Sequence, residues 1–381
     1  MFIQSRNVYF NEKFEALQIE VANGKIKAIL AYGTNKDVKD YGDLLILPGL
    51  VDIHNHGYLN CDANHATEEW LNTWVNYLPS EGVTSTLSTI STCPKATFMQ
   101  GLSNIGNFLD KEHRGSHILG VYEEGPLISV KYCGAQDTNY QIKPSDEFID
   151  EINVACHGHL IYAMIAVDEL HGNYEVISNT VKKGIRVAIG HSGATFEECT
   201  AAIRAGASSF THTFNGMRGL HHREPGCVGA AMFYDNVYAE LICDGIHVEK
   251  HAANILAKTK DKDHLILITD SVKLKGLALG EYKVDENDDR LVTICADGVG
   301  RLADGTLAGS CNKLNKVLRF AIKEAKIDKV QAINAATINP LRMLGIKNKG
   351  LIEVGYDADI AIFDDDFNTQ AVYIDGKEFT L

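Results

Sequence analysis

The sequence lacks an apolar run long enough to cross a membrane, and it lacks a C-x-x-C pair. No stretch reaches about 18 apolar residues, which predicts no transmembrane span. The nine cysteines are odd in number and scattered, as is typical of reduced thiols in the cytosol. The first residues, MFIQSRNVYF, have neither the apolar core nor the small-residue cleavage site of a secretory signal. We therefore expect a cytoplasmic protein.

Basic residues are also in deficit. The chain has 36 Lys and Arg against 50 Asp and Glu, a formal net charge of -14, which argues against nucleic acid as a main partner. A small anionic substrate is still compatible with this balance, because one local Arg or His can bind a phosphate. The 381 residues are enough for a large α/β barrel and a small second domain.

Both ends of the chain have the pattern of β-strands. LQIEVA and KIKAIL flank Asn23-Gly24, a strong hairpin signal, and the last residues contain LIEV, DADIAIFD and AVYIDGKEFTL. Neither end has enough apolar surface to fold alone. We expect residues 1–47 and 350–381 to form one small β-sandwich domain from both termini.

Between these ends, eight short apolar runs alternate with helical segments. This pattern predicts an α/β fold, a (β/α)8 TIM-type barrel over residues 48–349. Two predicted helices are FEECTAAIRAGA, which begins with a capping box of Thr195 and Glu198, and VEKHAANILAKTK. EYKVDENDDR, near residue 285, predicts a hairpin or excursion. The eight runs are LVDIH near residue 52, VTSTLSTI near 86, ILGVYEE near 121, LIYAMIAV near 163, RVAIGH near 188, SSFTHT near 210, VYAELICD near 240 and HLILITD near 267.

Six of the eight runs have His, Asp or Glu at or just after their carboxyl ends. The active sites of barrel enzymes lie at this end of the strands. Imidazole and carboxylate ligands suit a divalent metal such as Zn, Fe, Mn or Co, which would lower the pKa of a bound water. A carboxylate such as Asp270 could then accept and return a proton. The polar residues are His54 and His56, Glu123 and Glu124, His191, His212, Asp244 with His247, and Asp270.

Other histidines lie outside this set. His157 and His159 have the same spacing as His54 and His56, but they precede the fourth run and belong to the opposite end of the barrel. Isolated loop histidines such as His222 are most often solvated. Arg223 beside it is either a surface residue or, because its loop follows the sixth run, an anion-binding one.

Several motifs resemble a known family. PGLVDIHNHG resembles the opening of the amidohydrolase superfamily. From about residue 45 to the end, the chain resembles the N-acetylglucosamine-6-phosphate deacetylases, which implies hydrolysis of N-acetylglucosamine 6-phosphate to glucosamine 6-phosphate and acetate by a homodimer. The motifs are EEGP, GHSGAT, THTFNGMRGLHHREPG, DGIHV, LITDS, LAGS, NAATINPLRMLG and DADIAIFD.

The resemblance also implies roles for residues. Glu124, His191 and His212 would hold the main metal, and Asp270 would be the general base and then the general acid. His54 and His56 match an H-x-H pair whose retention suggests a second metal, so one or two ions per subunit are expected. Arg223 and His247 would pair with the phosphate, with help from a neighbouring subunit. The implied substrate-binding set is Ala135, Gln136, Asn215, Gly216, His222, Arg223, Asp244, His247, Leu307, Ala308 and Gly309.

Two positions depart from the family pattern. Gln136 stands where the family usually has a His that polarises the acetyl carbonyl, and an amide can donate a hydrogen bond but carries no charge. The preference between glucosamine and galactosamine substrates is therefore open. After LAGS the chain reads CNKLNK, where the family has apolar and Met residues, which could reshape one wall of the pocket.

Two alternatives stay open at this point. Many cyclic-amide hydrolases bridge two metals with a modified Lys at the end of the fourth strand, but the fourth run here ends in AVDEL. The second alternative is a protein that senses a sugar phosphate without catalysis, and Gln136 is the only residue that supports it.

Overall fold

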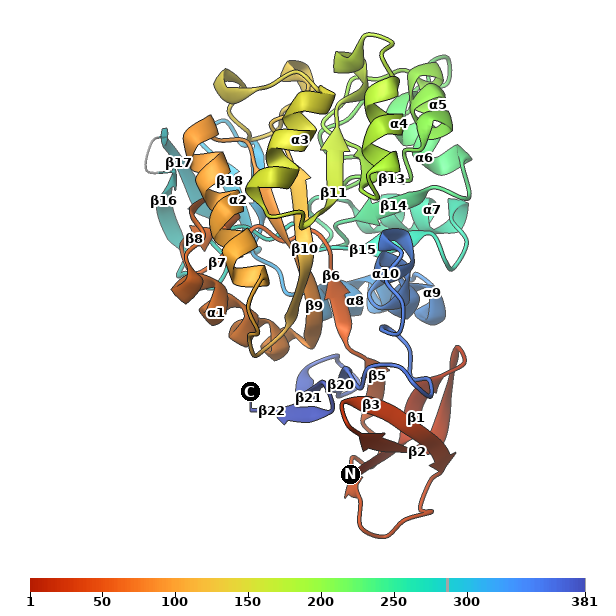
Figure 1. Cartoon of the computed structure of the whole chain (residues 1–381). Coiled ribbons are helices and arrows are strands. Elements are labelled where there is room, and N and C mark those ends of the chain that lie inside the picture. The colour runs from red at the N-terminus through yellow and green to blue at the C-terminus, as the bar shows by residue number, and fades with distance from the viewer. Residues whose placement is uncertain (286–287, 381) are drawn as a thin grey trace.

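The computed structural model describes residues 1–285 and 288–380 and contains a barrel with a smaller sheet below it (Figure 1). Eight parallel strands form the barrel in the order β6-β9-β10-β11-β12-β13-β14-β15. They coincide with the eight apolar runs, so the predicted barrel is confirmed. The strands are β6 (Leu50–Asp52), β9 (Val83–Ser91), β10 (His117–Glu124), β11 (Leu160–Ile165), β12 (Arg186–Ile189), β13 (Ser209–Phe210), β14 (Tyr238–Leu241) and β15 (Leu265–Leu267).

The barrel closes between its first strand, β6, and its last strand, β15, and polar residues follow both of them. In the strand order β6 and β15 stand at the two ends, and a parallel bridge between Asn55 and Ser271 joins the segments that follow them. The Asp270 amide donates to the His54 carbonyl (2.9 Å), and the His56 amide donates to the Ser271 carbonyl (2.8 Å). Closure therefore holds His54, His56 and Asp270 side by side.

Most strands have apolar residues on both faces, as expected for parallel strands covered on both sides, although β9 also buries Thr86 and Ser88, and β14 buries Glu240. One face contributes to a packed barrel interior, and the other packs against the surrounding helices. The interior cluster includes Val51, Leu87, Tyr122, Tyr162, Met164, Ala188, Ile242 and Ile266. Because these side chains fill the barrel, the space for a ligand lies at its ends.

Helices surround the barrel (Figure 1). At the start of α5, the Thr195 side chain accepts from the Glu198 amide and the Glu198 side chain accepts from the Thr195 amide, which confirms the capping box. In the described part of the chain no helix is both long and apolar enough to span a membrane. The helices are α1 (Glu68–Tyr77), α2 (Lys95–Leu109), α3 (Asp146–Ala155), α4 (Glu175–Lys182), α5 (Phe196–Ala205), α6 (Gly226–Phe233), α7 (Lys250–Thr259), α8 (Leu314–Lys323), α9 (Lys329–Ala335) and α10 (Ile338–Leu344).

Both termini contribute to the smaller sheet, which has the order β22-β21-β20-β5-β1-β2-β3 with β4 beside β1. Its core joins Ile3 and Ile19 from the first strands to Ile360 and Tyr373 from the last, so the predicted two-terminus domain is confirmed. Its exact boundaries, 1–47 and 350–381, stay a prediction. The strands are β1 (Phe2–Phe10), β2 (Lys13–Ala22), β3 (Lys25–Ala31), β4 (Lys39–Asp40), β5 (Leu45–Pro48), β20 (Ile360–Phe363), β21 (Thr369–Ile374) and β22 (Lys377–Phe379).

Two local predictions for this domain have different outcomes. Asn23 and Gly24, both with positive φ, turn the chain between β2 and β3 as predicted. The strand predicted for LIEV is wrong, because residues 351–354 form no strand. Gly350 and Gly355 flank this segment with φ of 80° and 90°, which interrupts an extended backbone. Ile352 still packs into the domain core.

An inserted antiparallel sheet separates the last barrel strand from α8. It comprises β16 (Gly280–Asp285), β17 (Asp288–Ile294), β18 (Val299–Leu302) and β19 (Leu307–Ser310). The first two strands confirm the hairpin predicted for EYKVDENDDR, although residues 286–287 of that segment lie outside the described residues. A two-stranded ribbon, β7 (Gly57–Tyr58) and β8 (Cys61–Asp62), follows the first barrel strand.

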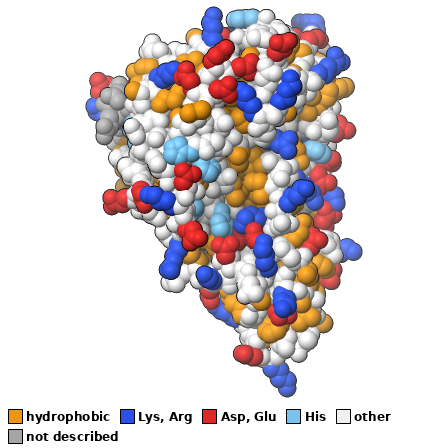
Figure 2. All heavy atoms as spheres, in the orientation of Figure 1, with side chains coloured by type: hydrophobic (Ala, Val, Ile, Leu, Met, Phe, Trp, Pro, Cys, Tyr) orange, Lys and Arg blue, Asp and Glu red, His pale blue; other side chains and the backbone are white. Residues whose placement is uncertain are grey.

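The face of the molecule seen in Figure 2 carries acidic and basic side chains interspersed with one another. In this view the basic residues are not gathered into a stripe of the kind that follows a nucleic-acid backbone.

Candidate active site

Three barrel strands end at a first group of potential metal ligands. Glu124 closes β10, and His191 and His212 follow β12 and β13. Glu124 Oε1 lies 3.1 Å from His191 Nε2 and 2.8 Å from His212 Nε2, and these two nitrogens are 3.1 Å apart. Side chains that lie 67 and 88 residues from Glu124 in sequence thus meet at one point.

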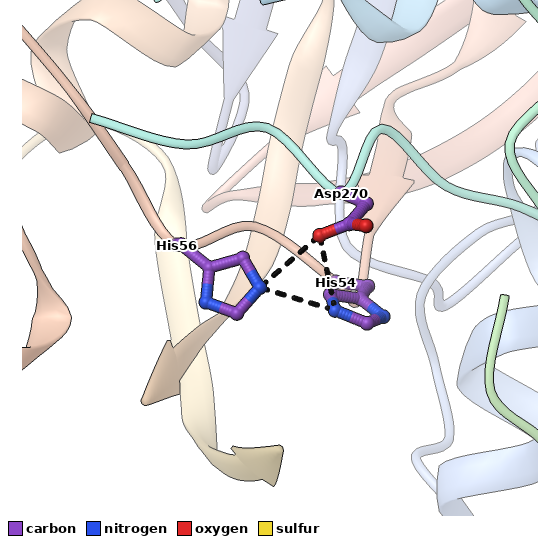
Figure 3. A group of neighbouring side chains, drawn as sticks. All are labelled: His54, His56 and Asp270. Atoms are coloured by element: carbon purple, nitrogen blue, oxygen red, sulfur yellow. Dashed lines mark hydrogen bonds and ion pairs between the residues drawn. The ribbon is translucent and has the colours of Figure 1, made fainter. Parts of the chain in front are cut away.

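His54, His56 and Asp270 form a second group, which Figure 3 shows and which lies beside the first. The two histidine Nε2 atoms are 3.2 Å apart, and Asp270 Oδ1 lies 3.4 Å from that of His54 and 3.1 Å from that of His56. Glu124 faces both groups, because its Oε2 atom lies 3.2 Å from His56 Nε2. One carboxylate could therefore contact two ions.

The donor atoms fit a divalent cation in distance and chemistry. Ligands 2.0–2.1 Å from a zinc ion at tetrahedral angles are about 3.3 Å apart, close to the spacings in both groups. The Nδ1 atoms point outward, where His54 donates to Glu240 Oε2 (3.0 Å), His191 to the Tyr132 carbonyl (2.8 Å) and His212 to the Asn215 carbonyl (3.1 Å). The proton on Nδ1 is thereby fixed, and Nε2 is the atom left to bind a metal.

The two site carboxyls are held in the ionised form. Burial raises the pKa of Glu124, but the charge of His54 and hydrogen bonds from His191 and His212 outweigh it and keep that pKa well below its ordinary value. Burial also opposes ionisation of Asp270, and the neighbouring His54 and His56 lower its pKa below the ordinary value. Imidazoles give up the Nε2 proton on binding a metal, so metal binding would release protons.

Three site residues have a backbone conformation that L-amino acids rarely adopt. The φ angles of His191, His212 and Asp270 are 43°, 26° and 47°. Such conformations cost about 1–3 kcal/mol each and persist where the surrounding structure enforces them. They occur here directly after three different strands, at the point where each side chain joins the ligand groups.

Sequence reasoning missed Glu240, which lies within β14. This side chain is completely buried, and its Oε2 atom accepts from His54 Nδ1 and from the His212 amide (3.1 Å). Oε1 accepts from the Tyr162 hydroxyl (2.8 Å). The available signal was a glutamate inside an otherwise apolar strand, because buried charges are rare unless paired.

A pocket of about 380 Å³ opens over the two groups. The inserted sheet forms part of its wall through Val292 and Leu302. The pocket contains most of the predicted substrate-binding set, namely Ala135, Gln136, Asn215, Gly216, His247, Leu307, Ala308 and Gly309. Their contact with a substrate stays a prediction.

Gln136 has a fixed amide orientation in this pocket. Its Oε1 atom accepts from the amide of Thr92 (3.1 Å) and from the hydroxyl of the same residue. The Nε2 donor therefore faces the metal groups and lies 3.2 Å from His191 Nε2. This amide nitrogen can donate a hydrogen bond to a substrate oxygen above the ligands.

The remaining three predicted residues do not line the described pocket. Asp244 lies behind it and accepts a hydrogen bond from His247 Nδ1 (2.7 Å). His222 and Arg223 are exposed on their loop, where Arg223 Nη1 is 2.7 Å from His222 Nε2. Within one chain, neither is part of the pocket wall.

The His157-Gly158-His159 motif is separate from the site, as predicted. His157 Nδ1 and His159 Nε2 lie 2.7 and 2.9 Å from the two carboxylate oxygens of Asp110, which directly follows α2. His159 precedes β11, at the end of the barrel opposite the ligands.

Comparison with known proteins assigns the chain to a family. The model of the amidohydrolase family matches residues 45–379, which includes every barrel strand. The chain belongs to the amidohydrolase family.

Curated proteins of similar sequence include sugar-phosphate deacetylases. N-acetylglucosamine-6-phosphate deacetylase of Bacillus subtilis is 34% identical over 93% of this chain and 91% of its own length. The enzyme of the same name from Lysinibacillus sphaericus is 32% identical, with 92% and 90% covered. N-acetylgalactosamine-6-phosphate deacetylase of Escherichia coli is 31% identical, with 94% of each chain covered.

Solved amidohydrolase structures agree in fold along the whole chain. N-acetyl-D-glucosamine-6-phosphate deacetylase of Mycobacterium smegmatis superposes with a TM-score of 0.92 at 28% identity, covering 100% of both chains. The Thermotoga maritima N-acetylglucosamine-6-phosphate deacetylase gives 0.88 at 28% identity, covering 100% of this chain and 99% of that one. The barrel and the two-terminus sheet are therefore shared with these enzymes.

Proposed function

We propose that this amidohydrolase removes the acetyl group of N-acetylglucosamine 6-phosphate and releases glucosamine 6-phosphate and acetate. The observation that carries the proposal is the convergence of two ligand groups beneath a pocket that contains Gln136 and His247. The names and coverage of the similar enzymes support the same substrate class.

Glu124, His191 and His212 would hold one divalent ion, and His54, His56 and Asp270 would hold a second. The ligands suit Zn, Fe, Mn or Co. A bound ion would supply hydroxide at neutral pH by lowering the pKa of water to about 7.

Asp270 is the residue that we assign to proton transfer. Its side chain is 14% exposed, against 0–8% for the other five residues of the two groups, so it is the most accessible to a bound substrate. Its ionised carboxylate would accept a proton from the attacking water and later donate it to the leaving amine. In these two steps the same carboxylate acts first as a general base and then as a general acid.

The other pocket residues would bind the sugar phosphate. The Gln136 amide would donate to the acetyl oxygen, and His247 would donate to the phosphate. Because Arg223 is exposed and outside the pocket of its own chain, we propose that it reaches the phosphate in a neighbouring subunit of a homodimer. The nine cysteines are all free, which supports the cytoplasmic location that we also propose.

N-acetylgalactosamine 6-phosphate is the second candidate substrate. The N-acetylgalactosamine-6-phosphate deacetylase of Escherichia coli is about as similar as the N-acetylglucosamine-6-phosphate deacetylases, and Gln136 replaces the expected His in this pocket. Acetate release from the two phosphorylated sugars, measured side by side, would decide between them. Hydrolysis of a cyclic amide such as dihydroorotate, without acetate release from either sugar, would contradict both.

The proposed proton transfer is tested by Asp270→Asn. We expect acetate release to fall by about 10²- to 10⁴-fold, because an amide cannot accept the proton. Elemental analysis should find the ion at Glu124, His191 and His212 retained. Wild-type activity in this variant would contradict the assignment of Asp270.

A further inference from the structure

We propose that Asn312 is a positioning residue that acts through Asp244 to hold His247 ready for the substrate phosphate. Asn312 follows β19 and lies in the CNK segment, where the family resemblance predicts apolar residues. The inference rests on the proposed function in one respect, because it takes the phosphate to be the group that His247 binds.

The Asp244 carboxylate connects the other two side chains. Its Oδ2 atom accepts from His247 Nδ1 (2.7 Å) and from Asn312 Nδ2 (3.2 Å). Its Oδ1 atom accepts from the amides of Ile246 and His247 (both 2.8 Å). Asp244 and His247 are buried, with side chains 3% and 4% exposed. Four donors thus fix the carboxylate, and only Asn312 comes from outside the segment that follows β14.

His247 presents its other nitrogen to the pocket. Nε2 is buried and has no hydrogen-bond partner in the described part of the protein, although the residue lines the pocket. An unpaired buried polar atom is costly, so it marks a place where a ligand completes the hydrogen bonding. Because Nδ1 is bound to Asp244, Nε2 is the ring nitrogen left to contact a phosphate oxygen.

Asn312 is well anchored for this role. Its backbone amide donates to Ser310 Oγ (3.3 Å), and the backbone amide of Ser310 donates to the backbone carbonyl of Asp270 (3.0 Å). The segment that holds Asp244 is therefore tied to the backbone beside the proposed base. Without the Asn312 donor, Oδ2 would keep one side-chain partner, and the carboxylate and His247 would gain rotational freedom.

The experiment compares Asn312→Leu with the matched control Asn179→Leu. Asn179 Nδ2 donates to Asp146 Oδ2 (2.9 Å) between α4 and α3, so the control removes the same kind of bond away from the pocket. We expect Asn312→Leu to raise KM for N-acetylglucosamine 6-phosphate and the inhibition constant of inorganic phosphate about three- to tenfold, with a smaller effect on kcat. The control should change neither.

Unphosphorylated N-acetylglucosamine distinguishes a role of Asn312 in positioning His247 from general damage to the active site. Its kcat/KM should change less than twofold in Asn312→Leu, and Asn312→Ser, which adds no apolar bulk, should reproduce the loss of phosphate affinity. Equal losses for both sugars, or unchanged inhibition by phosphate in both Asn312 variants, would overturn the inference while leaving the proposed deacetylation intact. Absence of acetate release in the wild type would instead contradict the proposed function, and phosphate binding to the holoenzyme would still test Asn312.

Discussion

Replacing Glu240 by Gln should weaken the binding of one metal ion and spare the other. The substitution keeps the shape of a completely buried side chain and removes its charge. The Gln oxygen can still accept from His54 Nδ1 and the His212 amide, while its nitrogen faces the Tyr162 hydroxyl. What is lost is the negative charge that, in the proposed metal site, would make His54 a better ligand.

The expected loss of metal affinity follows from the contact of Glu240 with Nδ1 of His54, a proposed ligand. Loss of such a partner typically lowers metal affinity about 10- to 100-fold, or about 1.4–2.7 kcal/mol. His54 belongs to the group with His56 and Asp270, and its distance of 3.5 Å from Glu124 Oε1 is the longest contact between the groups. We therefore expect the ion at His54 to dissociate first in a chelator titration followed by elemental analysis.

Two controls distinguish this effect from general destabilisation. Glu198→Gln makes the same chemical change in the capping box of α5, away from the ligands, and should leave both affinities unchanged. Tyr162→Phe removes the donor to Glu240 Oε1 but leaves the contact with His54, and should have the smaller effect. Equal loss of both ions in Glu240→Gln, or affinities within twofold of wild type, would refute the reasoning.

Two further substitutions probe the pocket. Gln136→Ala should lower kcat about 10- to 100-fold with metal content unchanged, because it removes the fixed amide that we propose as a donor to the acetyl oxygen. Steady-state kinetics showing a change in KM alone would contradict this. Arg223→Ala should raise KM for the phosphorylated sugar about tenfold or more and leave the unphosphorylated sugar unaffected. The same KM change for both sugars would remove Arg223 from the phosphate site.

Local pattern was sufficient to predict the architecture and the candidate ligands. An apolar run that ends in a His or Glu predicts a buried strand and its carboxyl end to within a few residues, so His191 and Glu124 could be assigned to one rim. The capping box at Thr195 and the Asn23-Gly24 turn depend on neighbours no more than three residues away. LIEV shows the limit, because only Ile352 of its apolar residues enters the core, and the segment forms no strand.

The tertiary structure decided which partners those residues have. Glu240 meets His54 across 186 residues, Thr92 orients Gln136 across 44, and Asn312 reaches Asp244 across 68. None of these pairs leaves a periodic signal in the sequence, because each depends on barrel closure and on the course of an inserted sheet. The sequence by itself thus determined which chemical groups lie at the rim, and the packed barrel determined how each is oriented and charged.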